Sequence, residues 1–177
     1  RKGLNHLIYE IVDNSVDEHL AGECDTIWVT LEKDGSCTVE DNGRGIPVDM
    51  HAKGVSAARI VLSTLHAGGK FDDSSYKTSG GLHGVGSSVV NALSTYLDVE
   101  ICRDGAIHHD RYQRGIPVVK LENGLLPILG KTKKTGTKVN FLPDPTIFEK
   151  TKFKSEEIKS RLHETAYLNP ALTIIFE

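Results

Sequence analysis

The sequence lacks several features that define common classes of protein. It has no run of about 18 consecutive apolar residues, so no segment is long enough to cross a bilayer as a helix. Its 3 cysteines, Cys24, Cys37 and Cys102, show no C-x-x-C spacing, which argues against a metal site and indicates reduced, buried thiols of a cytosolic protein. The G-x-x-x-x-G-K-[ST] signature is absent too, which excludes a P-loop NTPase.

A surplus of basic residues is also missing. The 177 residues include 21 Lys and Arg against 24 Asp and Glu, which gives a formal net charge of -3. A domain that grips DNA phosphates usually has a positive balance. The densest basic run, 131–138, is interpreted as a solvated loop ahead of a strand. Any DNA that the parent protein handles is therefore expected to bind elsewhere.

Hydrophobic periodicity and turn residues predict alternating helices and hairpins. Asp34-Gly35 predicts a tight turn between the first two strands. Ala21-Gly22 and Asn169-Pro170 are expected to end helices, and Ser155 to cap one. The expected helices are 3–21, 55–65, 85–95 and 155–168, and the expected strands are 26–32, 36–41, 97–103, 106–113, 137–142 and 171–177.

This order of elements predicts one α+β domain over residues 1–177, with helices packed on one face of a mixed β-sheet. There is no regular β-α-β alternation, which disfavours a dinucleotide-binding fold. Residues 66–86 are rich in Gly and Ser and are too long for an ordinary connection. We interpret them as a functional loop that is mobile without ligand and ordered with it.

The first predicted helix carries two stripes of different chemistry. One is a core stripe at helical spacing, and the other is acidic with no Lys or Arg to offset its mild repulsion. An acidic face without partners indicates a site that awaits a cation or an arginine from elsewhere. A carboxamide among the acids suits Mg²⁺, which prefers hard oxygen ligands. The core stripe is Leu4, Leu7, Ile8, Ile11 and Ser15, and the acidic stripe is Glu10, Asp13, Asn14, Asp17 and Glu18.

Two glycine-bearing loops and one Gly-Thr pair add possible ligand contacts. Residues 41–47 follow a predicted strand, and their glycines allow a ligand to approach the backbone. Residues 80–86 run directly into a helix, whose unpaired N–H groups can bind phosphate. Thr135-Gly136-Thr137 opens a strand, where a hydroxyl could meet a base or a bridging water.

Together these segments resemble the Bergerat ATP-binding fold of the GHKL superfamily, which includes gyrase, heat-shock chaperones, MutL mismatch-repair proteins and sensor histidine kinases. The acidic stripe matches the family's N box, and residues 41–45 match its D-x-G-x-G box. Residues 81–86 match its third box, and Gly136-Thr137 match the last. Four motifs in the family's order argue strongly against coincidence.

Finer detail points to one branch of this superfamily. Residues 41–47, 65–71 and 79–86 are similar to those of bacterial type II topoisomerase ATPase domains, and the likeness runs along nearly the whole chain. Phe71-Asp72-Asp73 favours the gyrase branch over topoisomerase IV. MutL-type and chaperone-type ATPases are more distant alternatives because they lack the 66–86 sequence. A nucleotide-sensing module without turnover is an alternative of a different class.

The resemblance implies a role for each matched residue, with ATP and Mg²⁺ as the bound cofactors. Glu10 would be the general base and Asn14 the Mg²⁺ ligand. Asp41 would accept a hydrogen bond from the adenine amino group, with Thr137 nearby. Arg44 is expected to pair with Glu18. The pocket wall would comprise Gly43, Arg44, Gly45 and Pro47, and the cover over the ribose and phosphates Lys70, Tyr76, Gly81, Leu82, His83, Gly84, Val85 and Gly86.

The resemblance also implies partners outside this chain: a second copy of the same polypeptide, the other type of topoisomerase subunit (the gyrase A protein) and DNA, in the cytoplasm. The site would hold ATP or an ATP-competitive inhibitor. The chain is interpreted as a fragment without the arm that precedes Arg1 in the family and without the domain that brings a lysine to the γ-phosphate. We therefore expect it to be monomeric and to bind ATP with little turnover.

Overall fold

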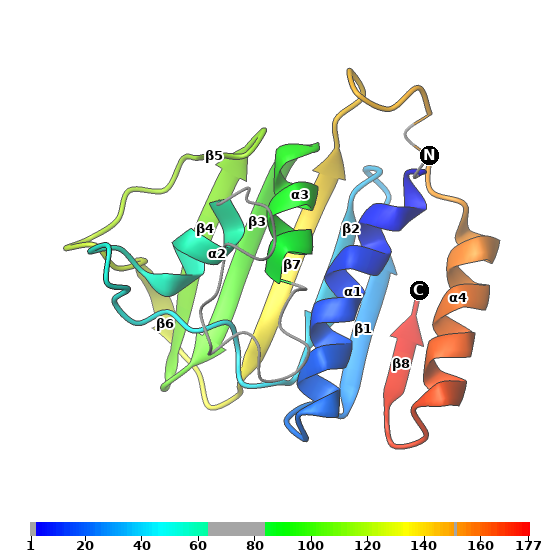
Figure 1. Ribbon diagram of the computed structural model, residues 1–177, viewed down its shortest axis with the longest axis horizontal. Coiled ribbons are helices and arrows are strands. Elements are labelled where there is room, and N and C mark those ends of the chain that lie inside the picture. The colour runs from blue at the N-terminus through cyan, green and yellow to red at the C-terminus, as the bar shows by residue number, and fades with distance from the viewer. Residues whose placement is uncertain (1–2, 64–83, 151) are drawn as a thin grey trace.

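The computed structural model describes residues 3–63, 84–150 and 152–177, and Figure 1 shows one sheet with helices on one of its faces. The α+β fold predicted from the sequence is therefore confirmed. The helices are α1 (Asn5–Leu20), α2 (Ala57–Ser63), α3 (Gly84–Ala92) and α4 (Ser155–Leu168). The strands are β1 (Thr26–Leu31), β2 (Cys37–Asp41), β3 (Ser94–Arg103), β4 (Ala106–Gln113), β5 (Ile116–Pro117), β6 (Ile128–Lys131), β7 (Gly136–Pro143) and β8 (Thr173–Phe176).

The sheet is mixed, and its strand order brings distant parts of the described chain together. The order is β5-β4-β3-β7-β2-β1-β8, with β6 also paired to β4. Strands β1 and β8 are parallel, whereas the other pairs are antiparallel. Strand β7 inserts between β2 and β3, which places the start of β7 beside the end of β2. This crossover joins two motifs that are about a hundred residues apart in sequence.

The hydrophobic core lies between α1 and the strands that α1 crosses. Leu7, Ile8 and Ile11 of α1 are buried, as the core stripe predicts. They belong to one cluster with buried residues of the central strands, such as Val39 and Phe141. All three cysteines are buried free thiols, which agrees with the sequence prediction. The part of the chain that the structure describes contains no helix long and apolar enough to cross a membrane.

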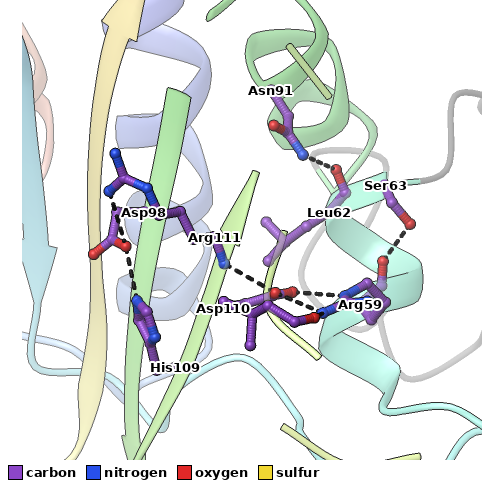
Figure 2. A network of polar contacts seen from close by, with 9 residues as sticks. Arg59, Leu62, Ser63, Asn91, Asp98, His109, Asp110 and Arg111 are labelled. Atoms are coloured by element: carbon purple, nitrogen blue, oxygen red, sulfur yellow. Dashed lines mark hydrogen bonds and ion pairs between the residues drawn. The ribbon is translucent and has the colours of Figure 1, made fainter. Parts of the chain in front are cut away.

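A buried polar network ties α2 to the sheet and to α3 (Figure 2). The guanidinium of Arg59 on α2 donates to both carboxylate oxygens of Asp110 on β4, at 2.9 and 2.8 Å. The side-chain amide of Asn91 on α3 donates to the carbonyl of Leu62 in the last turn of α2, at 2.8 Å. Helix α2 is thus held from two sides by specific hydrogen bonds rather than by apolar packing alone.

The first helix and the first hairpin form as predicted. Helix α1 ends with Ala21 as its C-cap, and Gly22 has a φ of 82°, a left-handed conformation that glycine adopts without steric cost. The β1–β2 turn uses Gly35 with a φ of 91°. The Asp34 carboxylate accepts hydrogen bonds from the amide and hydroxyl of Ser36 and so fixes the turn.

Three details of the predicted elements are wrong. The third helix ends at Ala92 and not at 95, because the chain from Ser94 pairs with β7 and β4 in strand β3. Ser155 is not the cap of α4: the N-cap is Lys154, and no side chain of its own caps it. Asn5 of α1 accepts from the Lys154 amide instead, at 3.1 Å. The edge strands β5 and β6, of 2 and 4 residues, were not predicted.

The predicted 66–86 loop falls mostly outside the described residues. Its last three positions belong to the first turn of α3, which begins at Gly84. Residues 66–83 are not described, so the prediction of their order with and without ligand stays a prediction.

Candidate nucleotide-binding site

The acidic face of α1 forms the first part of the site. Glu10 and Asn14 are one helical turn apart and lie on the same side of α1, which packs against α3. The side-chain amide of Asn14 donates a hydrogen bond to the hydroxyl of Ser87 on α3. This bond uses the nitrogen of the carboxamide and leaves its carbonyl oxygen as an acceptor.

Helix α3 brings its amino-terminal turn to Glu10. Gly86 faces the Glu10 carboxylate so closely that a β-carbon at position 86 would overlap Oε1. Helix α3 begins at Gly84, two residues earlier. The first N–H groups of a helix have no partner inside the helix and favour anions. A carboxylate and a set of phosphate-binding amides therefore lie at the same end of the site.

Asp41 forms the second part of the site, at the end of β2. Its side chain is buried, with a residue exposure of 7%. Oδ1 accepts the amide N–H of Gly43 at 2.9 Å and that of Thr137 at 3.2 Å, and Oδ2 accepts the hydroxyl of Ser15 at 2.6 Å. Burial raises the pKa of Asp41, and these three hydrogen bonds act in the opposite direction.

Two glycines allow the backbone around Asp41 to pack tightly. Gly136 has a φ of 141°, and a β-carbon there would overlap the carbonyl oxygen of Asp41. Gly45 has a φ of 89°, and a β-carbon there would lie 3.0 Å from the carbonyl oxygen of Cys102. Arg103 donates to the Gly45 carbonyl at 2.7 Å, which fixes the 42–47 loop against β3.

Thr137 contributes twice to this arrangement. Its amide binds Asp41, and its hydroxyl oxygen accepts the amide of Ile46 at 3.0 Å. The hydroxyl proton is not used by that contact and can be donated to a ligand or a water. The sequence placed Thr137 near the base-recognition carboxylate, and the structure brings the two residues together.

The predicted pairing of Arg44 with Glu18 is confirmed. Nη2 of Arg44 lies 2.8 Å from Oε1 of Glu18, and the Arg44 amide donates to Oε2 at 2.7 Å. Burial tends to raise the pKa of Glu18, but the hydrogen bonds and charge of Arg44 outweigh it and the pKa is lowered. Gly43 fits closely against this pair, since a β-carbon there would lie 2.7 Å from Glu18 Oε2.

The sequence interpretation missed two residues of the site. His6 lies one turn before Glu10 on α1, and its Nε2 is 2.6 Å from Glu10 Oε2. The spacing of four residues between them was the available signal. Ser15 was assigned to the apolar stripe, and it is buried there, but its hydroxyl binds Asp41. Its polar character at a core position was the signal.

The remaining predicted residues are placed less fully. Pro47 is half-buried at the end of the 42–47 loop. Gly84 and Val85 form the start of α3. Among residues 3–63, 84–150 and 152–177, no group of three or more His, Cys, Asp or Glu side chains could hold a metal ion by itself. Outside the described residues lie Lys70, Tyr76, Gly81, Leu82 and His83.

This fold and site define a class of protein that the comparisons identify. The sequence profile of the family described as Histidine kinase-, DNA gyrase B-, and HSP90-like ATPase matches residues 1–147, and the chain belongs to this family. The expected GHKL fold is thereby confirmed.

Within the family, the chain is similar to the ATPase-bearing subunits of topoisomerases. It is 58% identical to the DNA gyrase B protein of Thermotoga maritima over 100% of this chain and 27% of that protein. It is 57% identical to the DNA gyrase B protein of Archaeoglobus fulgidus, over 98% of this chain and 27% of that protein. It is 55% identical to the B-type polypeptide of DNA topoisomerase 4 from Streptococcus pneumoniae, over 97% of this chain and 26% of that protein. The chain thus spans about a quarter of the length of these relatives.

A solved structure supports the same placement. The crystal structure of the 43K ATPase domain of Thermus thermophilus gyrase B, in complex with an aminocoumarin, matches with a TM-score of 0.83 and 43% identity. The match covers 98% of this chain and 42% of that one. The resemblance to gyrase B ATPase domains that the motifs indicate is therefore confirmed over nearly the whole chain.

Proposed function

We propose that this chain binds ATP with Mg²⁺ and supplies the ATPase site of a cytoplasmic type II topoisomerase of the gyrase kind. The observation that carries the proposal is the buried carboxylate of Asp41, held by three donors at the end of β2. A buried carboxylate with acceptor capacity left over suits a ligand that presents an amino group. Adenine presents one, and Asp41 is its proposed acceptor.

The phosphate end of the site follows from the geometry of α1 and α3. Glu10 and Ser15 are five residues apart on α1, roughly 7.5 Å along the helix axis. A nucleotide whose base meets Asp41 would extend towards Glu10 and the start of α3. Glu10 would then accept a proton from the attacking water, and His6, within 2.6 Å of it, would orient its carboxylate.

The residues present fit a Mg²⁺ ion held mainly by the nucleotide. The Asn14 carbonyl oxygen is a hard ligand, and the bond from its amide to Ser87 fixes the carboxamide. The described residues offer no cage of three acidic or imidazole ligands, as expected for an ion whose other ligands are phosphate oxygens and water. Bound there, the ion would neutralise charge on the phosphates.

The rest of the proposed site includes residues that the structure places and residues that it does not describe. Gly43, Arg44, Gly45 and Pro47 would form the wall beside the base, and an ATP-competitive inhibitor would use the same wall. The proposed cover over the ribose and phosphates is Lys70, Tyr76 and residues 81–86.

The whole protein would couple ATP turnover to passage of DNA strands, with a second copy of the same polypeptide, the gyrase A protein and DNA as partners. Relatives named gyrase and topoisomerase 4 both match at more than 50% identity, so identity alone does not separate the two. The residues that favour gyrase are 71–73. The full-length protein reconstituted with its gyrase A partner should supercoil relaxed plasmid; efficient decatenation without supercoiling would favour topoisomerase IV.

The test of the ATPase assignment is Glu10→Gln in the full-length protein. A general base contributes roughly 10²–10⁴-fold to rate, whereas its share of ground-state binding is small. Turnover should fall by that amount while ATP affinity, measured by calorimetry, changes little. Equal loss of binding and rate would make Glu10 a structural acid. A full-length wild type that binds ATP without any turnover would favour the nucleotide-sensing alternative.

A further inference from the structure

Ser15 is a polar residue at a core position of α1. Its exposure is 3%, and it lies in the same stripe as the buried Ile8 and Ile11. A hydroxyl buried among apolar side chains is destabilising unless it finds a hydrogen-bond partner. The partner of Ser15 is Oδ2 of Asp41, at 2.6 Å. The reason for a serine at this position therefore lies in the site and not in the packing of α1.

The hydrogen bonds of Asp41 show what Ser15 contributes. An ionised carboxylate can accept about four hydrogen bonds, two on each oxygen. Oδ1 already accepts two, from the backbone amides of Gly43 and Thr137. Oδ2 accepts one, from Ser15. The remaining capacity is on Oδ2, so a ligand donor and the Ser15 hydroxyl would share this oxygen.

We propose that Ser15 is a positioning residue of the base-recognition site, which holds Asp41 as an acceptor so that Oδ2 receives the amino group of the nucleotide base. The inference rests on the proposed function, because it assumes that Asp41 meets an adenine. Among the described residues, Ser15 gives the one side-chain donor recorded on Asp41, since the other two donors are backbone amides. It is therefore the donor that a substitution can remove.

The charges around Asp41 leave its own protonation as the variable. Burial raises the pKa of Asp41, and the bonds from Ser15, Gly43 and Thr137 oppose that rise. Glu18 of α1 also raises it, but Glu18 is paired with Arg44, and its own pKa is lowered, so it stays ionised. Burial raises the pKa of the Cys24 thiol to about 11, so Cys24 stays neutral near neutral pH.

Loss of the Ser15 hydroxyl should move the pH dependence of nucleotide binding. Without that donor the pKa of Asp41 rises further, so the carboxyl takes up a proton at higher pH. A protonated carboxyl is a donor and opposes the amino group of adenine instead of accepting from it. A hydrogen bond to a charged group corresponds to a shift of about one to two pH units. Affinity should therefore fall at a higher pH in the variant than in the wild type.

The experiment compares ATP binding to wild type, Ser15→Ala and Ser15→Thr by calorimetry with Mg²⁺ present, from about pH 5.5 to 9. We expect S15A to match the wild type at the alkaline end and to lose affinity one to two pH units earlier on acidification. S15T keeps the hydroxyl and should follow the wild-type curve. The titration of His6 and His19 is common to all three proteins and cancels in the comparison.

A second ligand tests the direction of the hydrogen bond. Inosine triphosphate has a keto oxygen where ATP has the amino group, so it suits a protonated carboxyl and not a carboxylate. The preference for ATP over inosine triphosphate should therefore shrink on acidification at a higher pH in S15A than in the wild type. Ser94→Ala is the matched control, because Ser94 is also a buried serine but donates to the Val90 carbonyl. It should leave both curves unchanged.

The outcomes separate this inference from the proposed function. If S15A loses the same affinity at every pH, or if S15T follows S15A, Ser15 acts through packing and the inference is wrong. If the wild type binds neither nucleotide, the proposed function is wrong, and the inference falls with it. Thermal melts establish that each variant is folded. Ser15→Cys, with a similar size and a weaker donor, provides the same test should S15A fail to fold, with a smaller shift expected.

Discussion

Gly86 of α3 and Glu10 of α1 are in such close contact that a β-carbon on the glycine would overlap the carboxylate oxygen Oε1. The glycine box and the N box are therefore two sides of one contact. A glycine at 86 is needed here to seat the proposed general base, in addition to any contact it makes with phosphate. The same holds at the other end of the site, where Gly136 makes room for the Asp41 carbonyl.

Gly86→Ala should reduce turnover without destabilising the protein. Alanine favours a helix over glycine by up to about 1 kcal/mol, and the atom displaced is the far end of a flexible side chain. Glu10 should move away from its seat, and the rate of ATP hydrolysis by the full-length protein should fall roughly 10²-fold or more. Gly130→Ala is the control, because a β-carbon at Gly130 has no atom within 4 Å. Full turnover by G86A would show that the position of Glu10 is not important.

The buried ion pair between Arg59 and Asp110 should carry a large share of the stability of the α2 region (Figure 2). The side-chain exposures are 12% and 0%. Removing one partner of such a pair leaves an uncompensated charge and costs roughly 3–5 kcal/mol. Urea unfolding of Asp110→Ala should show a loss of this size.

The exposed pair of Arg103 and Asp104 gives a matched comparison. Asp104 is 76% exposed in its side chain, and its φ of 55° is one that asparagine tolerates. Asp104→Asn should change the free energy of unfolding by no more than about 0.5 kcal/mol. Equal effects of D110A and D104N would mean that burial does not govern the strength of these pairs.

The Arg44–Glu18 pair should contribute to stability above the acid range only. The pKa of Glu18 in the folded protein is lowered from its usual 4.5, so its contribution is present above that value and is lost as the pH falls through the folded pKa. Glu18→Gln should therefore flatten the acid side of the stability curve and have its largest effect near neutral pH. Thermal melts from neutral to acidic pH measure this. An effect that grew towards acidic pH would have the wrong sign.

The sequence predicted those parts of the structure that local patterns control. The stripe of Ile8 and Ile11 predicted the buried face of α1, and Asp34-Gly35 predicted the first hairpin. The amino-terminal end of α4 was different, because its cap is Asn5, 149 residues away from Lys154 in the chain. The strands β5 and β6 are short and pair only with β4, so their formation depends on the sheet already present.

The same distinction applies to the site. The acidic stripe and the glycine motifs indicated which residues take part, and Arg44 and Glu18 were correctly paired. The link between Ser15 and Asp41 was missed because it joins α1 to the end of β2, 26 residues apart. A core-stripe pattern cannot show that one of its members faces a carboxylate. The tight placement of Thr137 against Asp41 arises from the crossover of β7 beside β2.

The most direct test of the account is ATP binding by Asp41→Asn. Because burial raises the pKa of Asp41 in the folded protein, its charge opposes folding as the pH rises through that pKa. The neutral amide should therefore leave the thermal stability at neutral pH unchanged or raise it. The amide also turns an acceptor into a donor towards the base and leaves a group unpaired, at a cost of about 1–3 kcal/mol or more. The account predicts a folded D41N protein whose calorimetric affinity for ATP is lost, while a folded D41N that binds ATP as the wild type does would contradict it.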